Sequence, residues 1–243
     1  MRILLNIAYI GTNYSGWQTQ NNKKTVEQTI EQAFFEKLGD NIKLYASGRT
    51  DAGVHAFNQC AHFDTKLNIK PEKFATILNK VLPNDIRIMK SSLVSDNFHA
   101  RFDVKKKTYL YKIYFSQEEN PFKLDRALHI NRFLNVDNMI DASKAFIGTH
   151  DFTAFCKTTS NQKDCIRTIY NLEVKKIDNK IHIEITGNGF LHNMVRIIVG
   201  TLIDSGCNKL TKKDILDILK NKDRTKASKT VPAYALYLKD VEY

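Results

Sequence analysis

The order of strand-like and helix-like segments limits the fold of this chain more than any other feature. Strand patterns alternate apolar and polar residues with a period of two, and helix patterns place apolar residues three and four apart. Residues 1–97 give strands at 2–10, 42–46, 54–63 and 86–94, with helices at 25–38 and 71–82. The order strand, helix, strand, strand, helix, strand is that of the split β-α-β arrangement of ferredoxin-like domains.

The first helix has signals at both of its ends. Thr25 and Gln28 have the spacing of a capping box, so we expect the Thr25 side chain to cap the helix. Gly39 follows the last apolar residue of the stripe, where a left-handed glycine often ends a helix. The sequence therefore predicts a helix that Thr25 opens and Gly39 stops.

Residues 98–243 repeat this order of elements without repeating the sequence. They give a strand at 108–116, a helix at 136–147, a hairpin of strands 166–174 and 180–186, helices at 190–204 and 211–219, and a last strand at 234–241. We therefore predict an α+β fold of two ferredoxin-like (split β-α-β) halves, with their antiparallel sheets side by side and a cleft between them. The predicted domains are residues 1–97, which carry Asp51, and the more basic residues 98–243.

The loop between the predicted strands 42–46 and 54–63 holds one carboxylate between two glycines. Its sequence is Ala46-Ser47-Gly48-Arg49-Thr50-Asp51-Ala52-Gly53-Val54-His55-Ala56-Phe57. Asp-Ala-Gly between strands is ordinary turn chemistry, since an Asp side chain often caps a turn. The alternative is a nucleophile, because an ionised Asp on a tight loop can attack and Arg49 supplies a nearby cation. The pattern has neither the Gly-Lys-Ser/Thr of a P-loop nor the second carboxylate of a glycosidase.

The charge of the chain favours a polyanionic partner. Its 37 Lys and Arg exceed its 26 Asp and Glu by 11, and residues 101–243 hold 25 of the basic and 17 of the acidic residues. A basic surface attracts nucleic acid, although a coding bias toward Lys, Asn and Ile also produces many lysines.

Other sequence features indicate a cytoplasmic protein that holds no metal. No apolar run is long enough to span a membrane, the first residues lack the pattern of a signal peptide, and the four cysteines form no Cys-x-x-Cys pair. His55 and His62 point to opposite faces of one predicted strand, so they cannot share a metal there.

Nine contiguous residues, 48–56, resemble the catalytic motif of the tRNA pseudouridine synthase A family. Residues 14–20, 105–112, 148–155, 187–200 and 231–238 resemble further motifs of the family, in the same order. In the last of these, Ala235 stands where the family usually has glycine. The resemblance runs from Tyr14 to Leu238 and implies a homodimer of the two-halved fold.

The resemblance also implies the reaction, which is isomerisation of uridine to pseudouridine in the anticodon stem–loop of tRNA, at positions 38, 39 and 40, with neither cofactor nor metal. Asp51 is then the nucleophile, on the sugar or on the base. Tyr109 stacks on the flipped uracil and helps to move a proton, whereas Tyr111 is expected in the core. Arg196 pairs with Asp51 and keeps it ionised. Further residues implied to contact the RNA are Arg49, His55 and Leu236.

Two other interpretations stay open from the sequence. A different glycosyl-transfer enzyme on RNA, such as a base exchanger, would release free base or need a second base as substrate. A non-catalytic RNA-binding module built on paired ferredoxin-like sheets would bind RNA without modifying it, and would still do so after Asp51→Asn.

Overall fold

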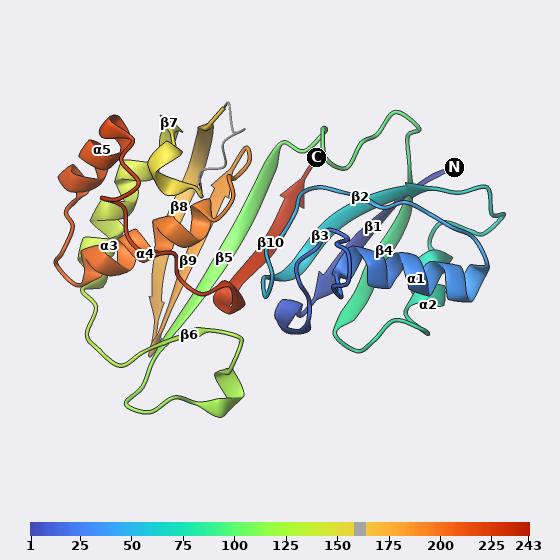
Figure 1. The fold of residues 1–243 in the computed structure, drawn as a ribbon, viewed down its shortest axis with the longest axis horizontal. Helices are drawn as coiled ribbons and strands as arrows, with labels where there is room; N and C mark the ends of the chain where they lie inside the picture. The colour runs from blue at the N-terminus through green and yellow to red at the C-terminus, as the bar shows by residue number, and fades with distance from the viewer. Residues whose placement is uncertain (158–163) are drawn as a thin grey trace. The chain divides into compact units, whose positions relative to one another are not determined.

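The computed structural model describes residues 1–157 and 164–243, which form a mixed α+β fold (Figure 1). Packing divides the chain into two compact units, Met1–Lys105 with Tyr237–Tyr243, and Lys106–Leu236. The predicted domains, 1–97 and 98–243, part close to the same place, but the last strand packs with the first unit. Whether the predicted domains fold separately stays a prediction.

The first unit is a sheet with two helices. Its elements are β1 (Arg2–Tyr9), the 3-10 turn η1 (Gly11–Asn13), α1 (Val26–Leu38), β2 (Tyr45–Ala46), β3 (His55–Asp64), α2 (Lys73–Leu78), β4 (Ile86–Val94) and β10 (Leu236–Glu242). β1 pairs antiparallel with both β3 and β4. β2 pairs antiparallel with β3, whereas β10 runs parallel to β3 with Tyr237 opposite His55. The predicted strand 42–46 is therefore real but reduced to its last two residues.

Alternation in β1 builds the core of the first unit. Its buried residues alternate with half-buried ones along the whole strand, and they are Ile3, Leu5, Ile7 and Tyr9. From α1, Phe34 packs against Phe63 of β3 and Phe74 of α2, with ring centroids 5.1 and 6.0 Å away. Both helices thus bury their apolar stripes on the sheet, as the periodicity predicts.

The start of α1 corrects one prediction. Thr25 makes no side-chain cap, and its buried hydroxyl has no hydrogen-bond partner. The first helix amides are already satisfied, because Val26 N donates to Gly16 O (3.2 Å) and Glu27 N donates to Trp17 O (3.0 Å). Tertiary carbonyls thus take the role that a capping side chain has elsewhere. At the other end, Gly39 has φ +69° and caps the helix as predicted.

The second unit is also a sheet with helices. Its elements are β5 (Lys106–Phe115), η2 (Pro121–Lys123), β6 (Leu128–Ile130), α3 (Val136–Ser143), η3 (Lys144–Phe146), β7 (Gly148–Asp151), η4 (Thr153–Phe155), β8 (Ile166–Ile177), β9 (Lys180–Gly187), α4 (Met194–Gly206), α5 (Lys212–Asn221) and η5 (Ala233–Ala235). The strands pair in the order β5-β9-β8-β7, all antiparallel, and β6 runs parallel to β5. The predicted hairpin is confirmed, with Asp178 at φ +52° in its turn.

The two helices near the end of this unit begin differently. α4 starts at Met194 rather than at the predicted residue 190, because Asn193 takes a left-handed conformation with φ +62°. α5 begins with a capping box, in which Thr211 Oγ1 accepts from Asp214 N and Asp214 Oδ2 accepts from Thr211 N. Within residues 1–157 and 164–243, no helix has the length and apolar character needed to cross a bilayer.

Candidate active site

The Asp51 loop joins β2 to β3 through a tight turn. Val54 N donates to Asp51 O at 3.1 Å, and Gly53 has φ +81°, a conformation that favours glycine. The Asp51 side chain is half-buried, and Arg49 two residues earlier is exposed. The backbone of the turn therefore fixes where the carboxylate begins.

A second loop, residues 11–17, packs directly on the Asp51 loop. Trp17 N donates to Thr50 O (3.1 Å), and Gly53 N donates to Tyr14 O (3.3 Å). A Cβ on Gly16, whose φ is +97°, would lie 2.6 Å from Thr50 O. Only glycine allows this approach, so Gly16 lets residues 11–17 pack against the Asp51 loop.

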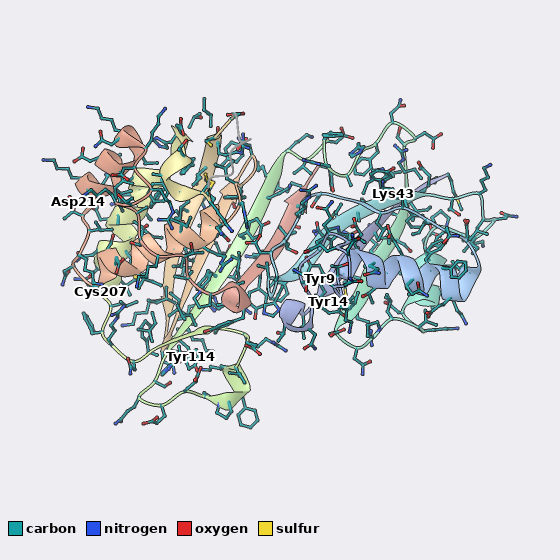
Figure 2. All side chains as sticks on the ribbon, in the orientation of Figure 1. Tyr9, Tyr14, Lys43, Tyr114, Cys207 and Asp214 are labelled. Atoms are coloured by element: carbon teal, nitrogen blue, oxygen red, sulfur yellow. The ribbon has the colours of Figure 1, made fainter. Side chains whose placement is uncertain are left out.

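Buried polar side chains hold the Asp51 loop by hydrogen bonds. Tyr9, which is labelled in Figure 2, has its Oη 2.8 Å from Thr50 Oγ1. Burial raises the pKa of Tyr9 far above its usual value, so the hydroxyl stays neutral. Ser47 Oγ donates to Gln59 Oε1 (2.6 Å), and Gln59 Nε2 donates to Gly48 O (2.9 Å). Sequence reasoning missed this network, although a glutamine among the buried residues of β3 was a usable signal.

His55 is held inside the first unit. Its side chain is 1% exposed, its Nδ1 accepts from Gly11 N at 2.9 Å, and its ring centroid lies 4.7 Å from that of Tyr237. These contacts give His55 a positioning role between the two loops. Its contact with RNA stays a prediction.

In the second unit, Tyr109 lies on β5 opposite Ile185 of β9. Its half-buried ring meets Phe190 edge to face, with centroids 5.2 Å apart and planes at 88°. Tyr111 is fully buried, as predicted, and its hydroxyl donates to Pro232 O at 3.0 Å. Burial raises the pKa of Tyr111 well above its ordinary value.

Arg196 lies in the first turn of α4, and its guanidinium is oriented by two acceptors. Nε donates to Val231 O at 2.8 Å, and Nη1 donates to Asn193 Oδ1 at 2.7 Å. The segment that carries Val231 can lie this close to α4 because residue 200 is a glycine. A Cβ at that position would overlap Lys229 O. Both acceptors escaped sequence reasoning, since one is a backbone carbonyl.

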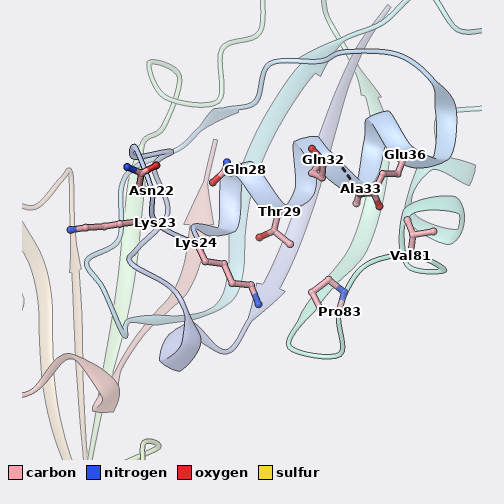
Figure 3. A pocket seen from close by; sticks show the side chains of 10 residues that line it. All are labelled: Asn22, Lys23, Lys24, Gln28, Thr29, Gln32, Ala33, Glu36, Val81 and Pro83. Atoms are coloured by element: carbon pink, nitrogen blue, oxygen red, sulfur yellow. Dashed lines mark hydrogen bonds between the residues drawn. The ribbon is translucent and has the colours of Figure 1, made fainter.

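Two hollows lie near these elements. A pocket of about 270 Å³ in the second unit is lined by Cys156, Lys157, Asn193, Ile197, Arg224 and Thr230. An open groove of about 620 Å³ runs along α1 in the first unit, and none of its lining residues belongs to the Asp51 loop (Figure 3).

Leu236, 5% exposed, follows the fully buried Ala235. In the parts of the chain that the structure describes, no three or more His, Cys, Asp or Glu side chains are grouped to hold a metal.

Comparison with known proteins places the chain among characterised relatives. A family model described as tRNA pseudouridine synthase matches residues 6–103 and 142–243. The tRNA pseudouridine synthase A of Bacillus subtilis is 43% identical over 100% of this chain and 99% of its own length. That of Ruminiclostridium cellulolyticum is 46% identical with the same coverage, and tRNA pseudouridine synthase A 2 of Clostridium tetani is 46% identical over 99% of this chain and 98% of its own length. A chain of a Cbf5-Nop10-Gar1 complex has a TM-score of 0.36 and 12% identity over 82% of this chain and 54% of its own, which is too weak to support an argument.

Proposed function

The chain belongs to the tRNA pseudouridine synthase family, and from that premise we propose which residues carry the reaction. The chain is an isomerase that converts uridine to pseudouridine in the anticodon stem–loop of tRNA. In this reaction the C1′–N1 bond breaks, the uracil turns, and C1′ bonds to C5, from which a proton leaves to water. N1, which loses its bond to C1′, takes up a proton in place of the one that C5 loses, so uridine and pseudouridine have the same composition.

Asp51 is the nucleophile, on the ribose or on the uracil ring. The observation that carries this assignment is the rigidity of its loop, because a nucleophile must be held near the reacting carbon before the barrier is crossed. The turn bond at Val54, the packing of residues 11–17 and the buried hydroxyl pair of Tyr9 and Thr50 all fix the backbone of this loop.

Arg196 keeps Asp51 ionised, and Tyr109 stacks on the flipped uracil. The two acceptors of Arg196 leave it a fixed direction, which suits a guanidinium that must meet one carboxylate. The edge contact with Phe190 fixes the ring plane of Tyr109, whose hydroxyl helps to transfer a proton. Arg49, His55 and Leu236 complete the contacts to the nucleotide.

The finer architecture is also part of this proposal. Each half is ferredoxin-like, the two sheets lie side by side with a cleft between them, and the protein is a cytoplasmic homodimer that uses neither cofactor nor metal. The first unit supports its part of the proposal, because its strands pair in the order β4-β1-β3-β2 and follow the order β-α-β-β-α-β along the chain.

Tritium release from C5 of uridine tests the function and the nucleophile together. Unmodified tRNA transcripts labelled at C5 are incubated with purified protein in EDTA, and the tritium in water is counted. We expect release by the wild-type protein and by Asp40→Asn, a control that changes a carboxylate of similar exposure in the same unit. We expect none from Asp51→Asn, although it still binds the RNA.

No release by the wild-type protein across a full set of unmodified tRNAs would contradict the proposal. Release of free uracil would favour a base exchanger, and binding without any modification would favour an RNA-binding module. Full release by Asp51→Asn would remove Asp51 from the role of nucleophile.

A further inference from the structure

Aromatic and cationic side chains gather at a second place in the first unit, which none of the proposed catalytic residues occupies. We call it the aromatic platform, and its residues are Lys43, Tyr45, His99, Arg101 and Phe102. Phe102 is 73% exposed and Tyr45 is 41% exposed, so both rings are accessible from solvent.

The rings of the platform form a continuous series from the core to the surface. At its base, His62 is 1% exposed, and the ring of Tyr45 stacks on it with centroids 5.1 Å apart and planes at 19°. His99 packs against His62 edge to face at 4.8 Å. Phe102 then lies 4.2 Å from His99 with planes at 32°. The buried ring of His62 and the half-buried ring of His99 therefore support the exposed rings.

Each exposed ring has a cation over it. The guanidinium of Arg101 lies 5.8 Å from the centroid of Phe102. The ammonium of Lys43, which is labelled in Figure 2, lies 5.7 Å from the centroid of Tyr45. The nearby carboxylate of Asp103 accepts from the backbone N of His99 at 2.8 Å. The surface thus combines solvent-exposed aromatic rings with positive charge.

The loop that carries Phe102 is held in place by hydrogen bonds to distant parts of the first unit. Arg2 Nη1 donates to the carbonyls of Asp96 and Phe98, both at 2.7 Å. Ala100 N donates to His62 Nδ1 at 3.1 Å, and Tyr243 Oη donates to Ala100 O at 2.9 Å. These bonds fix residues 96–100 before Phe102, and Lys105 N donates to Glu242 O at 2.9 Å after it, so the exposure of Phe102 belongs to the fold rather than to a loose loop.

We propose that the aromatic platform binds an unpaired nucleobase of the tRNA, at a site additional to that of the target uridine. The base stacks on Phe102, and Arg101 and Lys43 meet the adjoining phosphates. Unpaired nucleotides bind to surfaces that combine aromatic rings with cations. Every base has a π-face that can stack on a ring, and every phosphodiester linkage has a negative charge that a cation attracts. The inference rests on the proposed tRNA substrate.

The charge argues for RNA rather than for a second copy of the chain. A second copy placed face to face on the platform would bring its own Arg101 and Lys43 against these cations, in a chain whose net charge is already +11. Like charges brought together at an interface are unfavourable, whereas a phosphodiester neutralises them.

Substitution of Phe102 tests the proposal through binding of an unmodified tRNA transcript. Phe102→Leu keeps apolar volume without a ring, and we expect its Kd to rise about 5- to 150-fold, as loss of one base–aromatic stack predicts. Phe102→Trp retains a ring, so it binds like the wild-type protein, and its added fluorescence is quenched by tRNA. Phe122→Leu, at a phenylalanine of the second unit that is 94% exposed, is the matched control and leaves Kd unchanged.

Two further arms separate stacking from charge. A fully paired RNA duplex offers no exposed base face, so Phe102→Leu and wild-type protein bind it equally. Arg101→Gln lowers the slope of log Kd against log salt by about 0.7 to 0.9, the share of one phosphate contact. Equal melting temperatures for all variants exclude a folding defect.

A Kd for Phe102→Leu within twofold of the wild-type value would overturn the proposal. So would a change of oligomeric state in light scattering with an unchanged Kd, which would make the platform an interface between copies. If wild-type protein still releases tritium in either case, the platform fails while the proposed function stands. If wild-type protein releases none, the proposed function has failed.

Discussion

Gly200→Ala sets two energetic effects against each other in the middle of α4. Replacing glycine by alanine in an open helix interior stabilises by about 1 kcal/mol. At Gly200, however, the new Cβ would overlap Lys229 O and lie 3.4 Å from Val231 Cγ1. Overpacking of this kind costs about 1–3 kcal/mol, and the overlapping atom belongs to the backbone, which cannot rotate away.

The segment around Lys229 cannot move without loss. Arg224 Nη1 donates to Ala227 O and Ser228 O, both at 3.1 Å, and Val231 O accepts from Arg196. Setting the gain of about 1 kcal/mol against a cost of about 1–3 kcal/mol leaves a net loss of up to about 2 kcal/mol, which is a fall of up to about 8 °C in melting temperature for a chain of this size. Tritium release should fall by up to about 100-fold, because a displaced Val231 carbonyl misdirects Arg196.

Gly206→Ala is the matched control in the same helix. Its Cβ would meet Met139 Cγ at 2.9 Å and Met139 Sδ at 3.0 Å, and a methionine side chain can rotate to make room. We expect its melting temperature to stay within about 2 °C of the wild-type value. A Gly200→Ala protein that melts at or above the wild-type temperature with full activity would refute the reasoning.

Three further outcomes follow from contacts described above. Thr211→Ala should lose about 1 kcal/mol in urea unfolding because a capping box disappears, whereas Thr25→Val should lose nothing, because the Thr25 hydroxyl bonds nothing and valine keeps the buried methyl group; equal losses would contradict the difference. Tyr9→Phe should cost about 1–2 kcal/mol by leaving the buried Thr50 hydroxyl without its partner, and an unchanged urea midpoint would contradict this. Burial lowers the pKa of His62 to about 4, below its value in the unfolded chain, so the unfolded state takes up the proton first as pH falls. The unfolding free energy should therefore drop between about pH 6.5 and pH 4, and His62→Phe should flatten that dependence in urea titrations.

The sequence predicted the elements whose signals are local. β4 occupies the predicted residues 86–94, Gly39 ends α1 as expected, and α5 lies over most of the predicted residues 211–219. The same reasoning was wrong at Thr25, because amide groups at the start of α1 bond to carbonyls of a distant loop. A capping pattern shows that a side chain is able to accept a hydrogen bond from the first amides of a helix. The tertiary structure decides whether it forms that bond.

The candidate site divides in the same way. The residue type and flanking glycines of Asp51 fit an ordinary turn as well as a nucleophile, and it is the resemblance of residues 48–56 to a family motif that singles Asp51 out. Its role stays a prediction. The supports of the site could not be found from the sequence, because Val231 contributes only a carbonyl oxygen, which every residue has. Gln59 is partly predictable from the sequence, since an amide side chain in a buried strand needs hydrogen-bond partners. Which partners it has, Ser47 and Gly48, depends on how β3 packs against the Asp51 loop.

The first unit contains a strand, β10, that is translated long after the rest of the unit. Tyr237 of this strand stacks on Phe57 at 4.8 Å, and Lys105 N donates to Glu242 O at 2.9 Å. The ribosome must therefore translate all of residues 106–236 before this sheet gains its strand, a delay of roughly 7–26 s at about 5–20 residues per second. During that interval the nascent chain presents β3 with an open edge beside the Asp51 loop. In a polypeptide that is released before residue 237, the edge of β3 stays unpaired. Because unpaired edges promote aggregation, we expect the product of premature termination to aggregate or to be degraded rather than to be a partly active enzyme.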